Sequence, residues 1–138
     1  MSKYGETVTQ VRDEKYLLEA LKEIGYQIEV HPEGAPLNSY YSDQEAKIAN
    51  IIIRRDQLRG AYGDVGFVHQ PDGQFAMIKD ELDEYRGYGT RWLGRVQQLY
   101  KEKQTLAMAR AKGYTLKGRE VINTSEGQQV RLQFIARR

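Results

Sequence analysis

The sequence predicts an α+β fold in which a mostly antiparallel sheet packs against two helices. Three observations indicate this class: short apolar runs bounded by turn residues, two stretches with helical spacing of apolar residues, and one well-defined hairpin sequence. A chain of 138 residues can bury a core without metals or disulfides. We therefore expect a single α+β domain over residues 1–138, with the element order β-α-β-β-β-β-α-β-β.

The first elements are a strand, a helix and a second strand. Tyr4–Val11 is rich in β-branched residues and is expected to form a strand. Asp13 fits an N-cap, and apolar residues then recur at helical spacing as far as Gly25, which fits the left-handed position after a helix. Alternation over Tyr26–Val30 predicts the second strand. His31–Ser42, with its prolines and glycine, is expected to be a loop.

An internal strand and a hairpin follow. Ala46–Arg54 contains four isoleucines, which is too apolar for an exposed edge and predicts an internal strand. The apolar runs 65–68 and 75–78 flank the sequence Gln70–Pro71–Asp72–Gly73. Proline presets a turn φ angle and glycine accepts a positive one, so this segment predicts a β-hairpin. Glu81–Gly89, acidic and then glycine-rich, is expected to be a loop or a frayed turn.

The last elements are a long helix and two strands. Thr90 fits a cap, and a buried apolar stripe that includes Leu106–Ala107 continues to about Lys112, before Gly113. Strands are then expected over Tyr114–Ile122 and Val130–Ile135.

The two predicted helices end in the same way. Residues 21–26 read LKEIGY and residues 109–114 read ARAKGY, so each helix passes through glycine and tyrosine into a strand. This similarity is compatible with two related βαββ halves that pack as one sheet-and-helix sandwich. Glycine is also the usual helix terminator, so the similarity arises equally well between unrelated segments.

Composition argues against several classes of protein. The absence of cysteine excludes thiol catalysis, disulfides and cysteine-ligated metals, and it fits a reducing compartment. The N-terminal residues lack an apolar signal region, and no window approaches the roughly 18 apolar residues of a membrane span. We therefore expect a cytoplasmic protein without membrane association. The formal net charge of +2 is lower than nucleic-acid-binding proteins usually show, so charge leaves that class open.

No cofactor or metal site is predicted. His31 and His69 are the only histidines, and they lack the spacing of metal ligands. The acidic run Asp80–Glu84 could bind a hard cation, but it lacks the alternating pattern of a calcium loop. Acidic runs beside loops are usually solvated, and we adopt that interpretation. No carboxylate pair stands out for acid–base catalysis, so the sequence favours a binding protein over an enzyme.

The most suggestive segment for binding is Glu84–Arg95, with the sequence EYRGYGTRWLGR. Arginines and aromatic residues alternate in it, with glycines between them. Arginine can hold phosphate and an aromatic ring can stack on a base, while a helix start also attracts anions. A second arginine group at the end of the internal strand could join this segment in one patch. The candidate residues for nucleic-acid or anion binding are Arg86, Arg91, Trp92, Arg95, Arg54 and Arg55.

The same segment also fits a structural interpretation. Trp92 and Leu93 would then lie in the core, the two tyrosines Tyr85 and Tyr88 would cover it, and the arginines would solvate its rim. The second arginine group would merely end a buried strand in water. The sequence leaves both interpretations open.

Four segments of the chain also carry a family likeness. They are LLEALKEIGYQIEV, KIANIIIRR, YGDVGFVHQPDGQFAMIKD, and WLGRVQQLYKEKQTLAMARAKGY with the closing GQQVRLQF. In this order they resemble the uncharacterised family called hypothetical chloroplast open reading frame thirty-five, found in algal plastids, cyanobacteria and other bacteria. The family has no established activity.

The resemblance implies a partner. Genes of relatives often lie near one for an AAA+ ATPase, which implies a companion of such a machine, although gene order cannot name a mechanism. We therefore expect an accessory or interaction module with a protein partner. The alternative is a nucleic-acid-binding module that uses residues 84–95.

Overall fold

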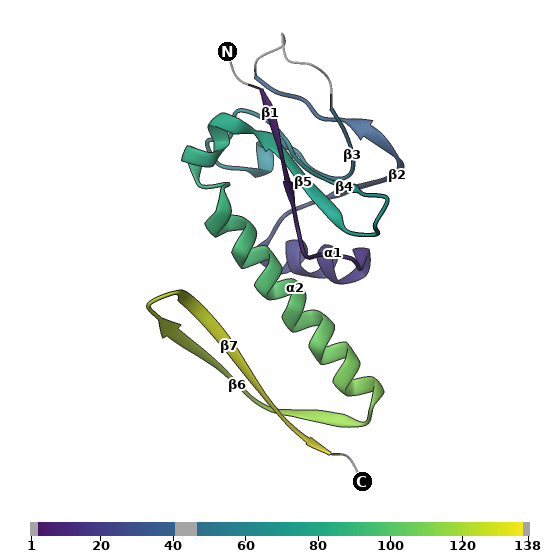
Figure 1. Ribbon diagram of the computed structural model, residues 1–138, viewed down its shortest axis with the longest axis vertical. Helices are drawn as coiled ribbons and strands as arrows, with labels where there is room; N and C mark the ends of the chain where they lie inside the picture. The colour runs from purple at the N-terminus through teal and green to yellow at the C-terminus, as the bar shows by residue number, and fades with distance from the viewer. Residues whose placement is uncertain (1–2, 41–46, 137–138) are drawn as a thin grey trace.

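The computed structural model describes residues 3–40 and 47–136 and contains a five-stranded sheet, two α-helices and a separate hairpin (Figure 1). This confirms the predicted α+β class and the order of strands and helices. The elements are β1 (Tyr4–Val8), α1 (Glu14–Ile24), β2 (Glu29–Pro36), β3 (Ile48–Ile53), the 3₁₀ helix η1 (Arg55–Gln57), β4 (Val65–His69), β5 (Phe75–Asp80), the 3₁₀ helix η2 (Glu81–Arg86), α2 (Thr90–Ala111), β6 (Tyr114–Thr124) and β7 (Gly127–Ala136).

The large sheet has the strand order β1-β5-β4-β3-β2, and all neighbouring strands are antiparallel. The predicted hairpin forms its centre, because β4 and β5 pair from Gly66 opposite Ile78 to His69 opposite Phe75. Gly73 in the turn has a φ of +89°, a conformation that glycine adopts without strain. The first strand of the chain pairs with the outer side of β5, so a long-range contact completes the sheet.

The strand after α1 lies further along the chain than predicted. β2 covers Glu29–Pro36 instead of Tyr26–Val30, so the loop prediction for His31–Ser42 is wrong as far as Pro36, and residues 41 and 42 lie outside the described residues. β2 is an edge strand with an irregular register against β3, and Pro32 is tolerated at such an edge because one side of the strand needs no partner. Pairing with β3 therefore outweighs the local loop signal.

Both helices contribute to one core with the sheet. α1 buries its predicted apolar stripe and ends at Gly25, whose φ is +116°. The hydroxyl of Tyr100 in α2 accepts hydrogen bonds from the backbone N–H groups of Arg12 and Asp13 at 3.2 and 3.0 Å, which ties the start of α1 to α2. The buried cluster contains Val11, Leu17, Ala20, Leu21, Ile51, Ile53, Leu58, Val65, Phe67, Phe75, Met77, Tyr88, Trp92, Leu93, Val96 and Tyr100.

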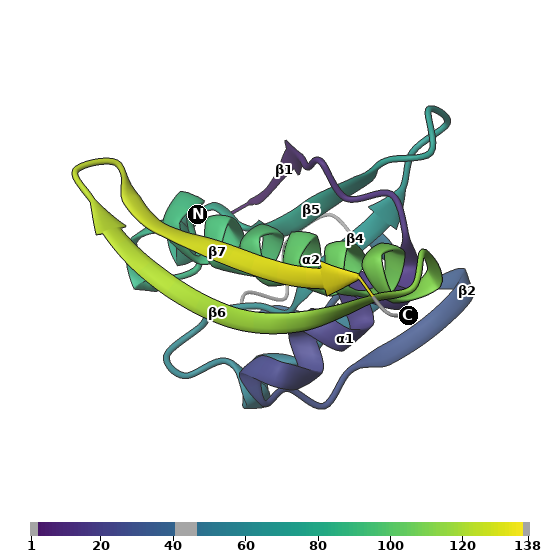
Figure 2. The ribbon, with the colours of Figure 1, turned by 90° about the horizontal axis from the view of Figure 1, so that it is seen from below.

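The last two strands do not join the large sheet. β6 and β7 form their own two-stranded sheet, which lies beside α2 (Figures 1 and 2). β1, β2 and β3 of the first βαββ segment all belong to the large sheet. The two βαββ segments therefore occupy different structural settings and do not pack as equivalent halves of one sandwich. Within the described residues, no helix combines the length and the hydrophobicity needed to cross a bilayer.

Gly66 in β4 lies in a tightly packed part of the sheet. A Cβ atom there would come within 2.5 Å of the Ala49 Cβ and 2.9 Å of the Leu37 Cδ2. We expect Gly66→Ala to lower the free energy of unfolding by about 1–3 kcal/mol because the neighbours must move. Gly94→Ala is the control: a Cβ there would meet no atom within 4 Å apart from its own stretch of helix backbone, so the change should raise stability by about 0.5–1 kcal/mol through helix propensity. Urea denaturation measures the free energy of unfolding of both variants. A Gly66→Ala protein as stable as the wild type would contradict the close packing of Ala49 and Leu37 around Gly66.

Candidate binding surface

One arginine from each predicted group, Arg55 and Arg86, reaches Tyr62 at one end of the sheet. The guanidinium of Arg86 lies 4.3 Å from the centre of the Tyr62 ring, and its Nη2 donates a hydrogen bond to the Tyr62 hydroxyl. Arg55 Nη1 donates to the Tyr62 carbonyl at 3.4 Å, and its guanidinium lies 5.7 Å from the centre of the Tyr40 ring. We call these four residues, Tyr40, Arg55, Tyr62 and Arg86, the Arg–Tyr patch. It combines cations and aromatic rings from three separate segments of the chain.

Arg54, the neighbour of Arg55, is occupied by two carboxylates. Its Nη1 lies 2.8 Å from Asp64 Oδ2, while Nε and Nη2 each donate to Glu29 at 2.9 Å. The hydrogen bond from Arg54, followed by that from His31, lowers the pKa of Glu29 to about 2. The hydrogen bond to Glu29 likewise raises the pKa of Arg54. Arg54 therefore supports the patch as part of an internal ion-pair network.

Asp64 fixes the backbone at one side of the patch. Its side chain is buried, and its Oδ1 accepts the backbone N–H of Arg55 at 2.7 Å. Oδ2 accepts the backbone N–H of Asn38 at 2.7 Å in addition to Arg54. One carboxylate thus satisfies two backbone donors and one guanidinium, which holds Arg55 in place.

Asp83 fixes the backbone at the other side. Its Oδ1 accepts the N–H of Tyr62 at 2.8 Å, and its Oδ2 accepts the N–H of Gly63 at 3.2 Å. Burial raises the pKa of this carboxyl. Asp80, also fully buried, accepts the N–H of Leu82 at 2.9 Å at the start of η2. Asp83 thus positions the loop that carries Tyr62, and Asp80 positions the start of η2, which carries Arg86.

The prediction that the acidic run is solvated is therefore wrong for Asp80 and Asp83. The expected loop contains η2, and the two buried carboxylates accept the backbone N–H groups of Tyr62, Gly63 and Leu82. Burial, and then the negative charges of Asp64, Asp80 and Asp83, raise the pKa of Tyr4 to about 12. Glu84 does reach the surface, where it lies 2.9 Å from Lys79 Nζ. Among the residues that the structure describes, no group of three or more acidic, histidine or cysteine side chains is arranged to hold a metal ion.

Trp92 lies in the core. Its side chain is 8% exposed, and Nε1 donates a hydrogen bond to the Tyr26 hydroxyl at 3.0 Å. Its ring centre lies 6.0 Å from that of Tyr88, 6.2 Å from that of Tyr26 and 6.5 Å from that of Phe67. A nucleic-acid base cannot stack on this ring while the core is intact. The structure therefore supports the structural interpretation for Trp92 and for its buried neighbour Leu93.

Arg91 and Arg95 lie one turn apart on α2, and both are exposed. Within residues 3–40 and 47–136, neither forms an ion pair with a carboxylate. The structure thus brings Arg55 and Arg86 together, places Arg91 and Arg95 on the helix surface, and separates Trp92 from them. Sequence reasoning did not select Tyr40 or Tyr62; the only signal for them was the high number of tyrosines, ten in this chain.

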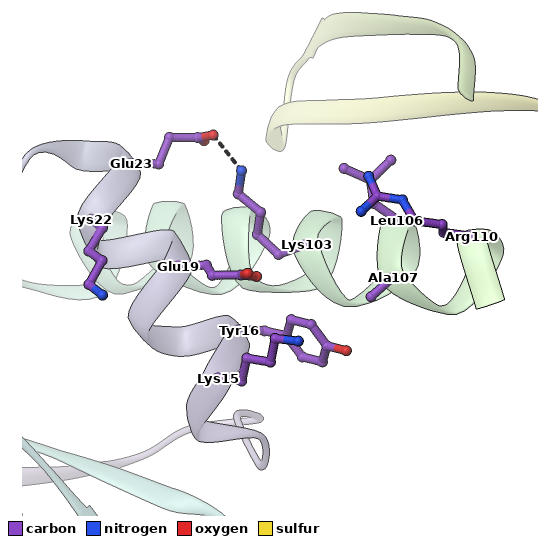
Figure 3. Close-up of a pocket in the computed structure, with 9 residues that line it drawn as sticks. All are labelled: Lys15, Tyr16, Glu19, Lys22, Glu23, Lys103, Leu106, Ala107 and Arg110. Atoms are coloured by element: carbon purple, nitrogen blue, oxygen red, sulfur yellow. Dashed lines mark hydrogen bonds and ion pairs between the residues drawn. The ribbon is translucent and has the colours of Figure 1, made fainter. Parts of the chain in front are cut away.

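A groove lies between α1 and α2 (Figure 3). Its volume is about 560 Å³, and Lys103 Nζ bonds to Glu23 Oε1 across it at 2.6 Å. Leu106 and Ala107 are only partly buried here, which corrects their predicted place in the buried stripe of α2. The physical reason is that the groove lies open beside this part of α2. It is lined by Lys15, Tyr16, Glu19, Lys22, Glu23, Lys103, Leu106, Ala107 and Arg110.

Comparison with known proteins connects most of the chain to one family. Residues 20–132, from within α1 into β7, match the family model described as "Protein of unknown function (DUF1257)". No curated protein and no solved structure matches the chain.

Proposed function

This chain belongs to the DUF1257 family of proteins of unknown function. We propose that it is a binding module whose Arg–Tyr patch recognises an acidic surface of a protein partner. The observation that carries the proposal is the convergence of Arg55 and Arg86 on Tyr62. Arginine and tyrosine are enriched among the residues that dominate the binding energy of protein interfaces. Arginine also pairs with carboxylates through two parallel hydrogen bonds.

The support beneath the patch favours binding. Asp64 holds the backbone of Arg55, and Asp83 holds the backbone of Tyr62. Association costs less free energy when the contact residues are already ordered in the free protein. The Arg–Tyr patch is thus suited to bind a partner without rearrangement of its backbone.

The identity of the partner rests on the sequence resemblance. We place the chain within the plastid and cyanobacterial group that its four segments resemble, and we propose an AAA+ ATPase as the partner because its gene often lies near those of relatives. We also propose that residues 1–138 act as a single domain and that the protein is located in the cytoplasm. The absence of cysteine favours that reducing compartment.

Affinity capture of the tagged full-length chain from its native host, with and without nuclease, tests this function. We expect a stoichiometric protein partner that survives nuclease and is lost from the Arg55→Glu, Arg86→Glu variant. The control variant Lys15→Glu, Lys22→Glu makes the same change in net charge in the groove between α1 and α2, and it should retain the partner. Circular dichroism verifies that both variants fold. Retention by the patch variant, or equal loss from both, would contradict the proposal.

A nucleic-acid-binding module is the second candidate. The observation that favours it is the exposed pair Arg91 and Arg95, which has no carboxylate partner within the described residues. Binding through these cations should fall steeply with salt, because each phosphate contact releases counterions. Fluorescence anisotropy with a labelled single-stranded oligonucleotide measures this, before and after the change Arg91→Glu, Arg95→Glu. Unchanged binding by that variant, or no binding by the wild type at low salt, rules this candidate out.

A further inference from the structure

Charge is distributed unevenly along this chain. Residues 91–138, which cover α2 from its second residue onward and the β6–β7 hairpin, contain eleven lysines and arginines but three acidic residues. Residues 1–90 contain ten lysines and arginines and sixteen acidic residues. The formal net charge of +2 therefore conceals an excess of eight positive charges in the helix–hairpin part of the chain. Such an asymmetry indicates that this part binds an anionic partner.

The hairpin is the outermost layer of this positively charged part. α2 lies between the hairpin and the large sheet (Figures 1 and 2). The apolar side chains of β7 line a cleft of about 380 Å³ against α2. Gln98 Nε2 donates to the Gln128 carbonyl at 3.0 Å, and Arg119 forms an ion pair with Glu102. One face of the hairpin is thus held on α2, and the opposite face is directed to solvent.

The solvent-directed face carries mostly polar side chains. Along β7, the residues Val130, Leu132 and Phe134 are partly buried toward α2, while the residues between them are exposed. The β6 residues paired with the exposed ones lie on the same face, because paired residues of an antiparallel hairpin share a face. We call this the outer face; its principal side chains are Glu120, Ile122, Gln129, Arg131, Gln133 and Ile135.

Three lysines border the hairpin. Lys101 lines the cleft beside β7, and Lys112 lies eleven residues further along α2, which is about three helical turns and so the same side of the helix. Lys117 lies at the irregular position near the start of β6. All three side chains are exposed, and none of the carboxylates that the structure describes forms an ion pair with them.

We propose that the outer face of the hairpin binds in the major groove of double-stranded DNA. This groove is about 12 Å wide and admits a two-stranded β-ribbon. The outer face presents the kinds of side chain that contact base edges there: the amides of Gln129 and Gln133 suit adenine, the guanidinium of Arg131 suits guanine, and aliphatic Ile135 suits the thymine methyl group. The bordering lysines supply contacts with phosphates.

The outer face favours duplex DNA over other nucleic acids. Proteins bind single strands largely by stacking bases on aromatic rings, and the outer face as defined by the register of β6 and β7 includes no aromatic residue. The major groove of double-stranded RNA is too narrow for side chains to read. The inference goes beyond the proposed function, since it uses neither the Arg–Tyr patch nor the pair Arg91 and Arg95.

Arg131 is available for such a contact. Its Nη1 lies 3.9 Å from Glu120 Oε2, and the two side chains are 60% and 61% exposed. Exposed pairs of this kind contribute little free energy, so Arg131 can exchange Glu120 for a base or a phosphate. Because α2 already holds the other face of the hairpin, the exchange requires no movement of the backbone.

Fluorescence anisotropy of the full chain with a labelled DNA duplex of mixed sequence and about 20 base pairs, roughly two helical turns, tests the proposal. At about 50 mM salt we expect a micromolar or lower Kd, and a loss of affinity of about tenfold or more by about 200 mM as the phosphate contacts release counterions. Single-stranded DNA and duplex RNA of the same sequence should each bind about tenfold more weakly.

Gln129→Glu, Gln133→Glu keeps the size of both side chains and places two negative charges on the outer face, so it should weaken duplex binding by about tenfold or more. Gln10→Glu, Gln27→Glu is the matched control, since both residues are exposed and lie outside the helix–hairpin part. It should change the Kd by about twofold or less. If circular dichroism shows that the hairpin variant does not fold, Arg131→Ala removes one cation and should weaken binding several-fold.

Several results would overturn the proposal. They are no binding of the duplex by the wild type at low salt, unchanged binding by the folded hairpin variant or by Arg131→Ala, an equal loss in the control, and equal affinity for duplex RNA. Tighter binding of single-stranded DNA that is lost from the Arg91→Glu, Arg95→Glu variant would also overturn it, and would instead support the second candidate function. Capture of the protein partner through the Arg–Tyr patch is unaffected by any of these results.

Discussion

Replacing Trp92 with alanine is expected to lower the free energy of unfolding by about 3–5 kcal/mol, the range seen when a large aromatic side chain is removed from a core. Trp92 lies among Tyr26, Phe67 and Tyr88, and its Nε1 donates the hydrogen bond to the Tyr26 hydroxyl. The substitution would leave a cavity between helix and sheet and would remove a partner from Tyr26. Urea denaturation followed by circular dichroism measures the loss, since the only tryptophan is absent from the variant.

Two further variants separate a core role of Trp92 from a surface role. Trp92→Phe keeps most of the ring and loses the hydrogen bond, so it should cost about 1–2 kcal/mol. Tyr85→Ala changes a side chain of the same segment that is 88% exposed, and it should alter stability by about 0.5 kcal/mol or less. A Trp92→Ala protein as stable as the Tyr85→Ala protein would contradict the placement of Trp92 in the core.

The second large effect is expected at Asp64. Asp64→Ala would leave Arg54 with one carboxylate fewer and the backbone N–H groups of Asn38 and Arg55 without their acceptor. Loss of one partner from a largely buried ion pair is strongly destabilising, because the remaining charge and donors stay desolvated. Arg54 is partly exposed, so we expect a loss of about 2–4 kcal/mol in the free energy of unfolding, somewhat below the full range for buried pairs.

Hydrogen exchange locates this effect. The amides of Asn38 and Arg55 should exchange faster in Asp64→Ala than in the wild type. The protection of the α1 amides relative to one another should not change. Asp56→Ala removes an exposed carboxylate in η1 and is the matched control, with an expected change of about 0.5 kcal/mol or less. Equal stability of the two alanine variants would show that Asp64 does not anchor the loops beside the patch.

Asp64 also connects stability with the proposed binding function. The carboxylate that holds the backbone of Arg55 also pairs with Arg54, so the patch and the end of β3 depend on the same buried group. Loosening of this group should reduce binding of the protein partner even though Asp64 itself is buried. Residues that position the contact side chains are thus as important for this surface as the contact side chains.

The local pattern of the chain was sufficient to predict several features. Gly25 ends α1 in the left-handed conformation, and the turn that contains Gly73 joins β4 and β5, both as expected. These features depend on residues close together in sequence, whose spacing and backbone preferences follow directly from the amino-acid sequence. The same reasoning also selected Arg55 and Arg86, which reach one surface, but not Tyr62 between them.

Contacts between distant segments determined the rest. β2 extends through Pro32 because β3 offers it a partner, and Asp80 and Asp83 are buried because loop N–H groups need acceptors. The meeting of Arg55 and Arg86 at Tyr62 likewise depends on the sheet, because β3 and β5 end at the same edge of it, on either side of β4. The sequence by itself therefore determined the type and order of the helices and strands, since these follow from local periodicity. Only the tertiary structure decided which side chains are buried, which strands share a sheet and which cations share a surface, because each depends on the desolvation and pairing of groups far apart in the chain.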